Sequence, residues 1–283
     1  MGIFDGCLLA SDIDDTLVVD NKVPLRNKEK IEFFMREGGC FSLATGRNIG
    51  ALGTVFKYID KVSPSVLANG CLIYDYDNKK ILHQVFLTEK DCYCAKKVLE
   101  MFDDTGIECH CGEEVYILNN THNVEDHLRY EGFSANEADF EFIISKPCNK
   151  IVMFPETPEK YQEIEKELRN GKFNADIINT TTTIDGIRRD LIEVIPKGSS
   201  KASQLLKLCE ILNIKKGCLY AIGDYYNDVA MLKSADISAT PAGAPEDVSV
   251  YATVKVGPAT DGAVADFIDY LTNERMKANG CSN

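Results

Sequence analysis

Three short apolar runs in the chain each pass abruptly into a polar segment. They cover residues 8–12, 40–46 and 218–224. Continuous apolar runs of this length are typical of parallel strands that are buried on both faces. Between the first two runs, apolar residues at helical spacing predict a helix that ends at Gly38-Gly39. They are Ile31, Phe34 and Met35. Strand, helix and strand in this order predict a doubly wound α/β sheet that is mainly parallel.

The middle of the chain has a different order of predicted helices and strands. Residues 71–87 predict a hairpin that turns near Asp77-Asn78, and from about Thr88 a helix precedes two strands. The helix-strand-strand order then recurs. The apolar stripe of the first helix is Cys92, Ala95, Leu99 and Phe102, and that of the second helix is Tyr161, Ile164 and Leu168. Two such units predict an inserted α+β domain, an open sheet with helices on one face. We expect a core at residues 1–85 and 192–283 and the insertion at 86–191.

The α/β pattern resumes at Ser200 with another helix. Its predicted apolar residues are Leu205, Leu206, Cys209 and Leu212. The chain therefore returns to the first sheet after the insertion.

Composition restricts the partners of the protein. With 283 residues and 45% hydrophobic content, the chain is long enough for one large domain or two of ordinary size. The formal net charge of −13 argues against nucleic acid or an anionic membrane surface as partner, because both need basic patches. No apolar run approaches the roughly 20 residues of a membrane span, and the first residues lack a signal-peptide pattern. The eleven cysteines fit reduced thiols better than a disulfide framework, so we expect a cytoplasmic protein.

Polar residues follow the predicted strands at their carboxyl ends, where open α/β sheets bind ligands. They are Asp12, Asp14, Asp15 and Thr16 after one strand, Thr45 and Arg47 after another, Asn69 after a third, and Asp224, Asn227 and Asp228 after a fourth. Clustered carboxylates repel one another and are costly to bury unless a cation neutralises them. Carboxylate oxygens suit Mg²⁺, which also takes water and phosphate oxygens. The sequence therefore predicts one magnesium site, with Arg47 and Lys201 as basic groups for a phosphate.

Four short motifs resemble those of the haloacid dehalogenase (HAD) superfamily. They are "DIDDT" at residues 12–16, "ATGR" at 44–47, "SSKASQL" at 199–205 and "GDYYND" at 223–228. Four matches in the right order, each at a predicted strand end or helix start, are far more specific than one. "ANG" at 68–70 and "TDGAVADFI" at 260–268 resemble further landmarks of the Cof-type branch. The insertion is similar to the type IIB cap of that branch. The resemblance thus implies a Rossmann-like catalytic core at 1–85 and 192–283 and a specificity cap at 86–191.

The resemblance also implies a role for each matching residue. Asp12 is expected to attack phosphorus and form an aspartyl-phosphate, which water then hydrolyses. Asp14 is expected to protonate the leaving oxygen and afterwards to activate that water. Thr45 and Lys201 complete the expected catalytic set by holding phosphoryl oxygens. The expected phosphate or substrate contacts are Thr45, Gly46, Arg47, Asn69, Lys201 and Asn227. The expected magnesium ligands are Asp12, the backbone carbonyl of Asp14, Asp224 and Asp228.

Some assignments stay open at this point. Asn227 and Asp228 either share the metal, or one of them orients Lys201. Lys197 is a nearby alternative for the lysine. Asp15 stands where many members of the superfamily have glycine, and aspartate tolerates turn conformations.

Taken together, these features predict a magnesium-dependent phosphatase that hydrolyses a small phosphorylated metabolite. The resemblance favours a sugar phosphate. A phosphosugar mutase would use the same aspartyl-phosphate and is the nearest alternative, and a non-catalytic phosphometabolite-binding protein is the second. The polar segment 180–186 with Arg188 and Arg189 contributes either to selectivity or to a solvated strand edge. The sequence names neither the substrate nor the oligomeric state.

Overall fold

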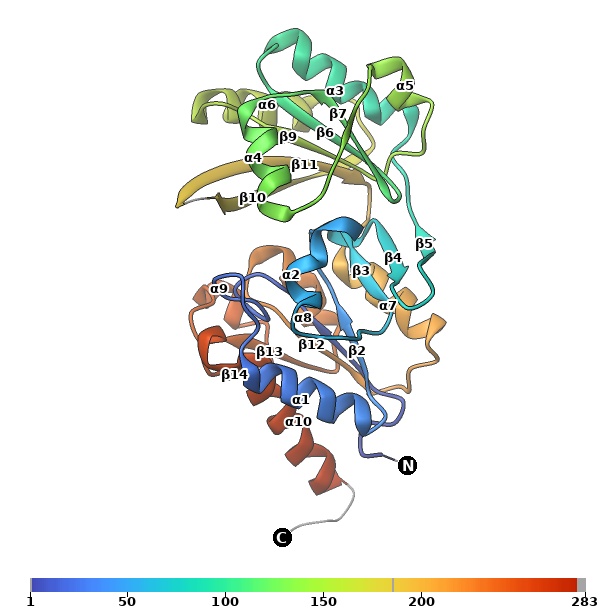
Figure 1. The fold of residues 1–283 in the computed structure, drawn as a ribbon, viewed down its shortest axis with the longest axis vertical. Coiled ribbons are helices and arrows are strands. Elements are labelled where there is room, and N and C mark those ends of the chain that lie inside the picture. The colour runs from blue at the N-terminus through green and yellow to red at the C-terminus, as the bar shows by residue number, and fades with distance from the viewer. Residues whose placement is uncertain (1, 185, 279–283) are drawn as a thin grey trace. The chain divides into compact units, whose positions relative to one another are not determined.

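The computed structural model describes residues 2–184 and 186–278, which form two compact units (Figure 1). Unit 1 comprises the described residues of Met1–Gly46, Gly53–Leu82 and Ser200–Asn283. Unit 2 comprises those of Arg47–Leu52 and His83–Ser199.

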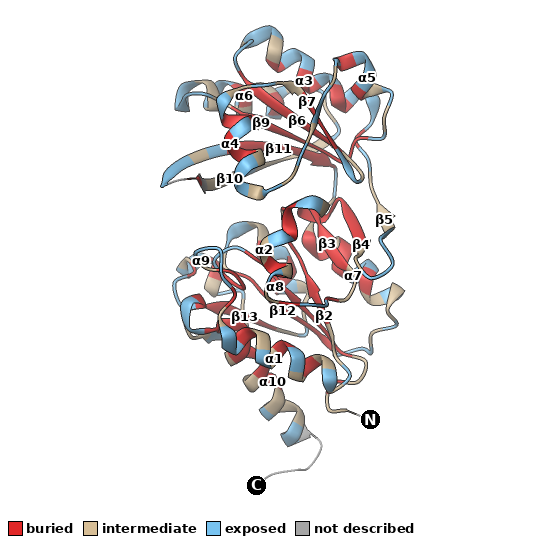
Figure 2. Ribbon diagram, viewed as in Figure 1, coloured by how far each residue is buried: buried red, intermediate tan, exposed pale blue. Residues whose placement is uncertain are grey.

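Unit 1 is built on a five-stranded sheet in the order β14-β13-β12-β1-β2, in which every adjacent pair is parallel. The strands are β1 (Leu8–Ser11), β2 (Cys40–Leu43), β12 (Leu219–Ile222), β13 (Ile237–Pro241) and β14 (Val254–Val256). Every residue of β1 and β12 is buried (Figure 2). This burial confirms the parallel strands predicted from continuous apolar runs.

Helices cover the sheet of unit 1. The helices α7 (Lys201–Ile211) and α8 (Val229–Ser234) share one apolar cluster with Leu8 of β1. The predicted helix α1 (Leu25–Arg36) packs against α10 (Ala263–Ala278). One detail of the predicted stripe on α7 is wrong, because Leu206 is exposed.

The remaining elements of unit 1 are short. A three-stranded sheet in the order β3-β4-β5 contains the predicted hairpin. Its strands are β3 (Ser65–Leu67), β4 (Leu72–Asp75) and β5 (Lys80–Gln84), of which His83 and Gln84 belong to unit 2. The short helices are α2 (Gly53–Phe56) and α9 (Glu246–Ser249), and the 3₁₀ turns are η2 (Ala68–Gly70), η3 (Tyr226–Asp228) and η4 (Ala259–Asp261).

Unit 2 contains a six-stranded sheet in the order β10-β11-β9-β6-β7-β8, antiparallel except for β7 and β8. The strands are β6 (Gly106–Cys111), β7 (Glu114–Asn119), β8 (Asn136–Glu137), β9 (Lys150–Phe154), β10 (Ala175–Ile184) and β11 (Ile187–Pro196). The helices are α3 (Glu89–Met101), α4 (His122–Glu131), α5 (Phe140–Ile144) and α6 (Pro158–Asn170), with the 3₁₀ turn η1 (Ile49–Leu52). Both predicted helix-strand-strand units are present, as α3-β6-β7 and α6-β10-β11.

The two faces of this sheet are covered differently. Ile151 and Met153 of β9 pack with α3, α5 and α6, whereas Val152 and Phe154 pack with Val124 of α4. Because neighbouring residues of a strand point to opposite faces, α4 lies on the face opposite the other three helices. The predicted fold class, a doubly wound α/β core with an inserted α+β domain, is confirmed. The expectation of helices on one face only is wrong.

The predicted domain boundaries differ from the two units. β11 pairs with β10 from Ile187 to Pro196, so a boundary after residue 191 falls inside a strand. Unit 2 therefore extends to Ser199, begins at His83 and includes Arg47–Leu52. The polar segment 180–186 forms the β10–β11 hairpin, and its Asp185 lies outside the described residues.

The ten cysteines within the described ranges are free thiols, and Cys281 lies outside those ranges. None of the helices in the described part of the chain has the length and apolar character needed to cross a bilayer.

Candidate active site

The carboxyl ends of β1 and β12 bring two acidic segments together. Ser11 pairs in register with Ile222, and the backbone N–H of Asp12 donates to the carbonyl of Ile222 at 2.9 Å. Asp12 and Asp224 therefore leave adjacent parallel strands at the same edge of the sheet.

Lys201 joins the two acidic segments. It is the first residue of α7, where the side chain of Ser200 caps the helix by accepting from the N–H of Ser203. The Lys201 side chain is 1% exposed, and its Nζ donates to Oδ1 of Asp12 at 2.7 Å and to Oδ1 of Asp228 at 2.6 Å. Burial lowers the pKa of Lys201, but the attraction of Asp12 and Asp228 outweighs it and raises the pKa overall. The ammonium therefore stays charged.

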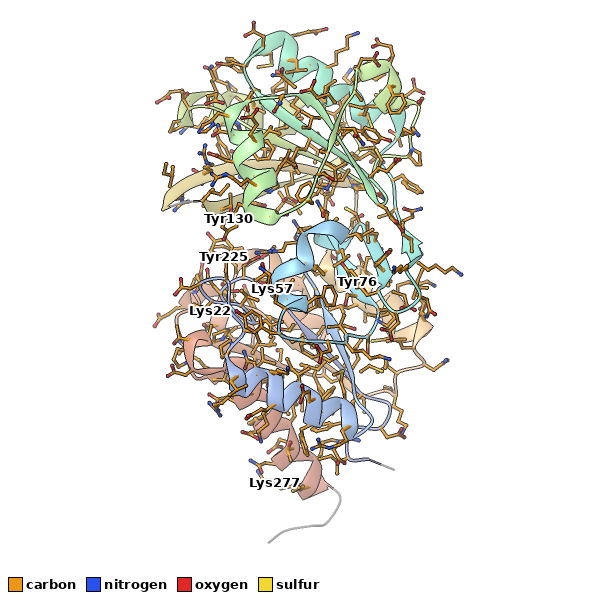
Figure 3. The ribbon with its side chains drawn as sticks, viewed as in Figure 1. Lys22, Lys57, Tyr76, Tyr130, Tyr225 and Lys277 are labelled. Atoms are coloured by element: carbon orange, nitrogen blue, oxygen red, sulfur yellow. The ribbon has the colours of Figure 1, made fainter. Side chains whose placement is uncertain are left out.

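Asp228 is fully buried, and both of its carboxylate oxygens are engaged. While Oδ1 accepts from Lys201, Oδ2 accepts from the backbone N–H of Asp224 and of Tyr225 at 3.1 Å each (Tyr225 is labelled in Figure 3). Gly223 permits this approach, since a Cβ there would lie 2.5 Å from Cγ of Asp228. The contacts favour the second alternative for Asp228, in which it orients Lys201 and the loop that carries Asp224.

Thr16 connects the first acidic segment to the second. Its buried Oγ1 donates to Oδ1 of Asp224 at 2.8 Å. Burial raises the pKa of Asp224 to about 7, and the charge of Asp228 adds to this effect, whereas the hydrogen bond from Thr16 opposes it. The sequence did not predict a role for Thr16. Its place in the motif "DIDDT" was the one feature that could have indicated a role in the site.

The three carboxylates of Asp12, Asp224 and Asp228 could hold a metal ion. One oxygen of each lies within 4.8 Å of the others. Burial raises the pKa of Asp12 well above its ordinary value, the ammonium of Lys201 opposes this shift, and the neighbouring carboxylates add to it. Three carboxylates around one ammonium leave negative charge that a divalent cation can balance, and hard oxygen ligands fit Mg²⁺. Asp12, Asp224 and Asp228 are therefore the candidate ligands in this group, and the role of each at the metal stays a prediction.

Asp14 lies outside this buried group. Its side chain is exposed, and its backbone forms a bridge with Val18. Asp15 follows with a φ of 55°, in the left-handed region that favours glycine. The turn after β1 therefore separates the exposed carboxyl of Asp14 from the buried carboxyl of Asp12.

Four of the predicted phosphate or substrate contacts lie together near the ends of β2 and β3. The backbone N–H of Asn69 donates to the carbonyl of Thr45 at 3.0 Å. A Cβ on Gly46 would lie 3.0 Å from Nδ2 of Asn69, and Nδ2 of Asn227 donates to Oδ1 of Asn69 at 3.4 Å. Asn69 adopts a φ of 55°, which asparagine tolerates better than most residues. The structure thus brings Thr45, Gly46, Asn69 and Asn227 together.

The remaining basic candidates are Arg47 and Lys197, and neither has the contacts of Lys201. Arg47 is buried and belongs to the segment grouped with unit 2, where its Nη1 donates to the carbonyl of Ala51 at 3.0 Å. Its contact to phosphate stays a prediction. Lys197 is exposed in a turn, in contrast to the buried Lys201.

Sequence reasoning did not find a second charged cluster, which lies in unit 2. Glu108 is fully buried, and its carboxylate lies 2.9 Å from Nδ1 of His127 and 3.2 Å from Nε2 of His110. Burial opposes the charge on Glu108 and His127, but their attraction dominates; it lowers the pKa of Glu108 to about 2 and raises that of His127 to about 10. The alternation Ile107, Glu108, Cys109, His110 along β6 was the available signal, because it places both polar residues on one face.

Known proteins share this sequence pattern and fold. The sequence profile of haloacid dehalogenase-like hydrolases matches residues 9–268. The 5-amino-6-(5-phospho-D-ribitylamino)uracil phosphatase of Bacillus subtilis (strain 168) is 29% identical over 122 residues. That alignment covers 43% of this chain and 40% of the relative, so the chain matches less than half of the relative's length.

Two solved structures resemble the whole chain. A haloacid dehalogenase-like hydrolase from Bacteroides thetaiotaomicron is 22% identical, with a TM-score of 0.79 over 94% of this chain and 99% of that one. A HAD subclass IIB sugar phosphatase is 18% identical, with a TM-score of 0.77 over 98% of this chain and 100% of that one. At these identities the likeness shows a shared fold.

Proposed function

This chain belongs to the haloacid dehalogenase-like hydrolase family, and we propose that it is a magnesium-dependent phosphatase acting on a small phosphorylated metabolite. The observation that carries the proposal is the contact of Lys201 with both Asp12 and Asp228 inside a group of three carboxylates. A carboxylate that attacks a phosphate needs a fixed position and nearby positive charge, and Lys201 supplies both for Asp12.

Asp12 is the nucleophile in the proposed reaction. An oxygen of its carboxylate bonds to phosphorus while the bond from phosphorus to the ester oxygen breaks, which gives an aspartyl-phosphate. The ammonium of Lys201, held by Asp12 and Asp228, stabilises charge on the phosphoryl oxygens. Thr45 holds a phosphoryl oxygen, and Gly46, Asn69 and Asn227 complete the phosphate and substrate contacts.

Asp14 is the general acid and then the general base. It gives its proton to the departing ester oxygen, and it then takes a proton from the water that attacks phosphorus. Its exposed position, outside the buried group, supports contact with a substrate that arrives from solvent. The second step releases phosphate and restores the carboxylate of Asp12.

Mg²⁺ would be held by Asp12, the backbone carbonyl of Asp14 and Asp224, and when bound it neutralises negative charge on the carboxylates and the phosphate. Thr16 and Asp228 keep Asp224 in place by their hydrogen bonds. The pKa of Asp224, raised to about 7, means that its carboxyl releases its proton near neutral pH when no ion is present.

The proposed substrate is a sugar phosphate, and unit 2 is the cap domain that recognises its leaving group. Two similar proteins are by name a phosphatase of a phosphoribityl compound and a sugar phosphatase, which supports this class of substrate. The free thiols of the described cysteines support a reducing compartment, the cytoplasm.

A phosphate-release screen tests the proposal. The purified protein with Mg²⁺ is assayed against several dozen phosphorylated metabolites and para-nitrophenyl phosphate, with the Asp12→Asn variant as control. We expect catalytic release that stops in excess chelator, returns with Mg²⁺ and is absent from the variant. Turnover that needs an added sugar bisphosphate, or persists after removal of the metal, would contradict the proposal. Binding without turnover would do so as well.

A further inference from the structure

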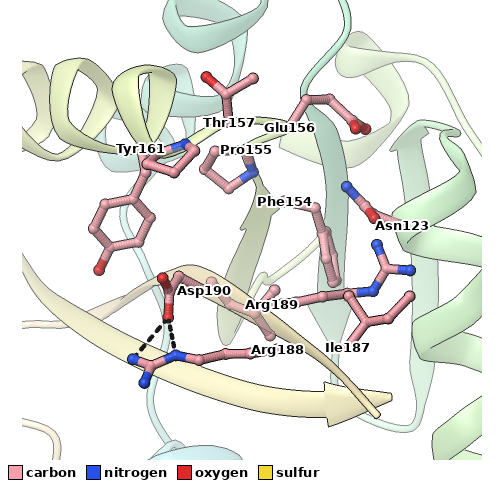
Figure 4. Close-up of a pocket in the computed structure, with 12 residues that line it drawn as sticks. Asn123, Phe154, Pro155, Glu156, Thr157, Tyr161, Ile187, Arg188, Arg189 and Asp190 are labelled. Carbon is pink, nitrogen blue, oxygen red and sulfur yellow. Dashed lines mark hydrogen bonds and ion pairs between the residues drawn. The ribbon is translucent and has the colours of Figure 1, made fainter. Parts of the chain in front are cut away.

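Unit 2 contains a cavity and a cluster of cysteines. The cavity has a volume of about 240 Å³, and Figure 4 shows the guanidinium of Arg188 bonded to Asp190 in its wall. Its two arginines, Arg188 and Arg189, are matched by the carboxylates of Asp190 and Glu156, so the lining has no net charge that would select a ligand. The cysteines have a defined chemistry of their own, because thiols that touch one another can form a covalent bond.

The cysteine cluster lies inside unit 2. Its five members are free thiols, and they come from α3, from β6 and from the segment before β9: Cys92, Cys94, Cys109, Cys111 and Cys148. All of them pack in the apolar cluster on the face of the sheet that α3, α5 and α6 cover. The proposed reaction uses none of these thiols.

Cys148 lies at the centre of the cysteine cluster. Its Sγ is within hydrogen-bonding reach of three other thiols, which are those of Cys92, Cys109 and Cys111. It also donates to the backbone carbonyl of Lys150 at 3.4 Å. An isolated buried cysteine acts as a small apolar residue, but a thiol in contact with other thiols has partners for a disulfide.

The backbone brings Cys111 and Cys148 opposite each other. His110 of β6 pairs in register with Lys150 of β9, and the N–H of Asn149 also donates to the carbonyl of His110, at 2.7 Å. Two residues of one chain thus oppose one residue of the other, as in a β-bulge, and the next pair is Cys111 and Cys148. Opposite residues of antiparallel strands have Cα atoms about 4.5–5.5 Å apart, within the range of about 4.4–6.8 Å that a disulfide spans.

Hydrogen bonds hold both chains at this position. The backbone N–H of Leu87 donates to the carbonyl of Cys148 at 2.8 Å. The fully buried side chain of Asn149 connects the two chains, since its Oδ1 accepts from the backbone N–H of Gly112 at 2.7 Å. The two thiols are therefore held near each other before any bond forms, which favours a disulfide between them over other pairs.

The two thiols differ in their access to solvent. Cys111 is half-buried, whereas Cys148 is 1% exposed. Hydrogen bonds with the neighbouring thiols, together with burial, raise the pKa of Cys148 well above its ordinary value, so Cys148 stays protonated and does not react first. An oxidant from solvent reaches Cys111 first, and Cys148 is the thiol that then reacts with the oxidised sulfur.

The geometry favours a disulfide over a metal site. A zinc site of four cysteines needs its sulfurs around one point, each about 2.3 Å from the ion. Within residues 2–184 and 186–278, three or more candidate ligand atoms lie within 4.8 Å of one another only in the carboxylate group of the candidate active site. The thiols of the cysteine cluster therefore meet as pairs around Cys148.

We propose that Cys111 and Cys148 are a site of reversible oxidation, at which hydrogen peroxide converts the two thiols to an intramolecular disulfide. The sulfur of Cys111 attacks one oxygen of the peroxide, the O–O bond breaks, and a sulfenic acid forms as one water is released. The sulfur of Cys148 then attacks the sulfur of Cys111. The S–S bond forms, and the sulfenic hydroxyl leaves as a second water with the proton of Cys148. Two thiols lose two electrons, and one peroxide is reduced to two waters.

Peptide mass spectrometry without reduction tests the site in the full chain. The protein is reduced, freed of reductant, treated while folded with a small molar excess of hydrogen peroxide, and quenched with an alkylating agent. The test variants are Cys111→Ser and Cys148→Ser. The matched control is Cys209→Ser, which removes a half-buried thiol of α7 in unit 1. Circular dichroism and thermal melting establish that each variant is folded.

We expect a disulfide between Cys111 and Cys148 that is at least about tenfold more abundant than any other pair and disappears on treatment with dithiothreitol. It should persist in Cys209→Ser and be absent from both test variants. In Cys148→Ser, dimedone should label Cys111 as the sulfenic acid.

The proposal is overturned if the folded, unmodified protein oxidises Cys111 to the sulfinic acid without forming the disulfide, or if other cysteine pairs form in equal yield. Because the unmodified protein gives the decisive result, a test variant that fails to fold does not prevent the test. The readout is the mass of peptides, so a failed phosphatase assay leaves it unaffected.

Discussion

The hydroxyl of Thr16 donates a 2.8 Å hydrogen bond to Oδ1 of Asp224, a residue 208 positions further along the chain. This bond links the turn after β1 to the loop after β12. Lys201 links the same two segments through Asp12 and Asp228. The candidate site is therefore held by two polar connections across one sheet edge, which meet where Asp228 accepts from the backbone N–H of Asp224.

Thr16→Val should weaken magnesium binding about tenfold. The variant keeps the shape of the side chain but removes a hydrogen bond to a carboxylate, an interaction of about 1.5–3 kcal/mol. Its loss also raises the pKa of Asp224 further, because the bond from Thr16 lowers that pKa. Calorimetric Mg²⁺ titration near pH 7 measures the effect, with Thr16→Ser as the control that retains the hydroxyl. Equal affinities for Thr16→Val and the unmodified protein would rule out this role.

Gly223→Ala should lower the turnover number about 10²-fold or more while leaving the protein folded. The new Cβ would lie 2.5 Å from Cγ of Asp228, so the carboxylate must shift and take Lys201 with it. Small displacements of a catalytic group have effects of this size. Gly53→Ala is the control, since nothing lies within 4 Å of a Cβ at that position. If both variants have the turnover number of the unmodified protein, the position of Lys201 set by Asp228 does not matter for catalysis.

Magnesium should stabilise the protein more at about pH 8 than at about pH 5. The folded-state pKa of Asp224 is raised to about 7 from an ordinary value of 3.8, so its contribution to stability is present below 3.8 and is lost as pH rises through about 7. A bound cation offsets that loss because it favours the ionised carboxylate. The rise in melting temperature on adding Mg²⁺, measured against pH, checks this. In Asp224→Asn the pH dependence of this stabilisation should become weaker, and what remains belongs to Asp12, whose pKa is also raised. An unchanged pH dependence in Asp224→Asn would show that Asp224 does not contribute to it.

His127→Gln should destabilise the protein by about 3 kcal/mol at neutral pH, because it leaves the buried charge of Glu108 without its cation. The folded-state pKa of His127 is raised to about 10 from 6.5, so its stabilisation is complete below 6.5 and is lost as pH rises through about 10. The difference in unfolding free energy between the two proteins should therefore shrink towards about pH 10. His122→Gln, on the exposed surface of the same helix, is the control and should change stability little. A difference that is constant with pH would show that the charge of His127 does not matter.

The sequence was sufficient to place the main acidic residues because parallel strands end at one edge of a sheet. Asp12 and Asp224 follow apolar runs whose burial required that topology, and Lys201 starts the helix after the insertion. Asp15, the departure from the family pattern, has the left-handed φ of 55° that glycine would adopt easily. These features depend on local pattern and on chain order.

Other features depend on contacts that no local pattern encodes. Thr16 finds its acceptor far along the chain, and Gly223 is required by the carboxylate of Asp228 rather than by its own backbone. The strand β9 has four consecutive apolar residues after Lys150 and no alternation, so its place between β11 and β6 could not be inferred. The alternation along β6 places Glu108 and His110 on one face, but the contact of Glu108 with His127 forms only when α4 packs against β6.

The most direct test of the proposed reaction is to trap phosphate on Asp12. Asp14→Asn retains the nucleophile but lacks the group that activates water, so with an aryl phosphate, whose leaving group needs little protonation, the intermediate should accumulate. The variant is mixed with Mg²⁺ and para-nitrophenyl phosphate, quenched in acid and analysed by peptide mass spectrometry. The account predicts a phosphate adduct on Asp12 that is absent from the Asp12→Asn, Asp14→Asn double variant. Release of para-nitrophenol by Asp14→Asn with no adduct on Asp12, or with an adduct on another residue, would contradict it.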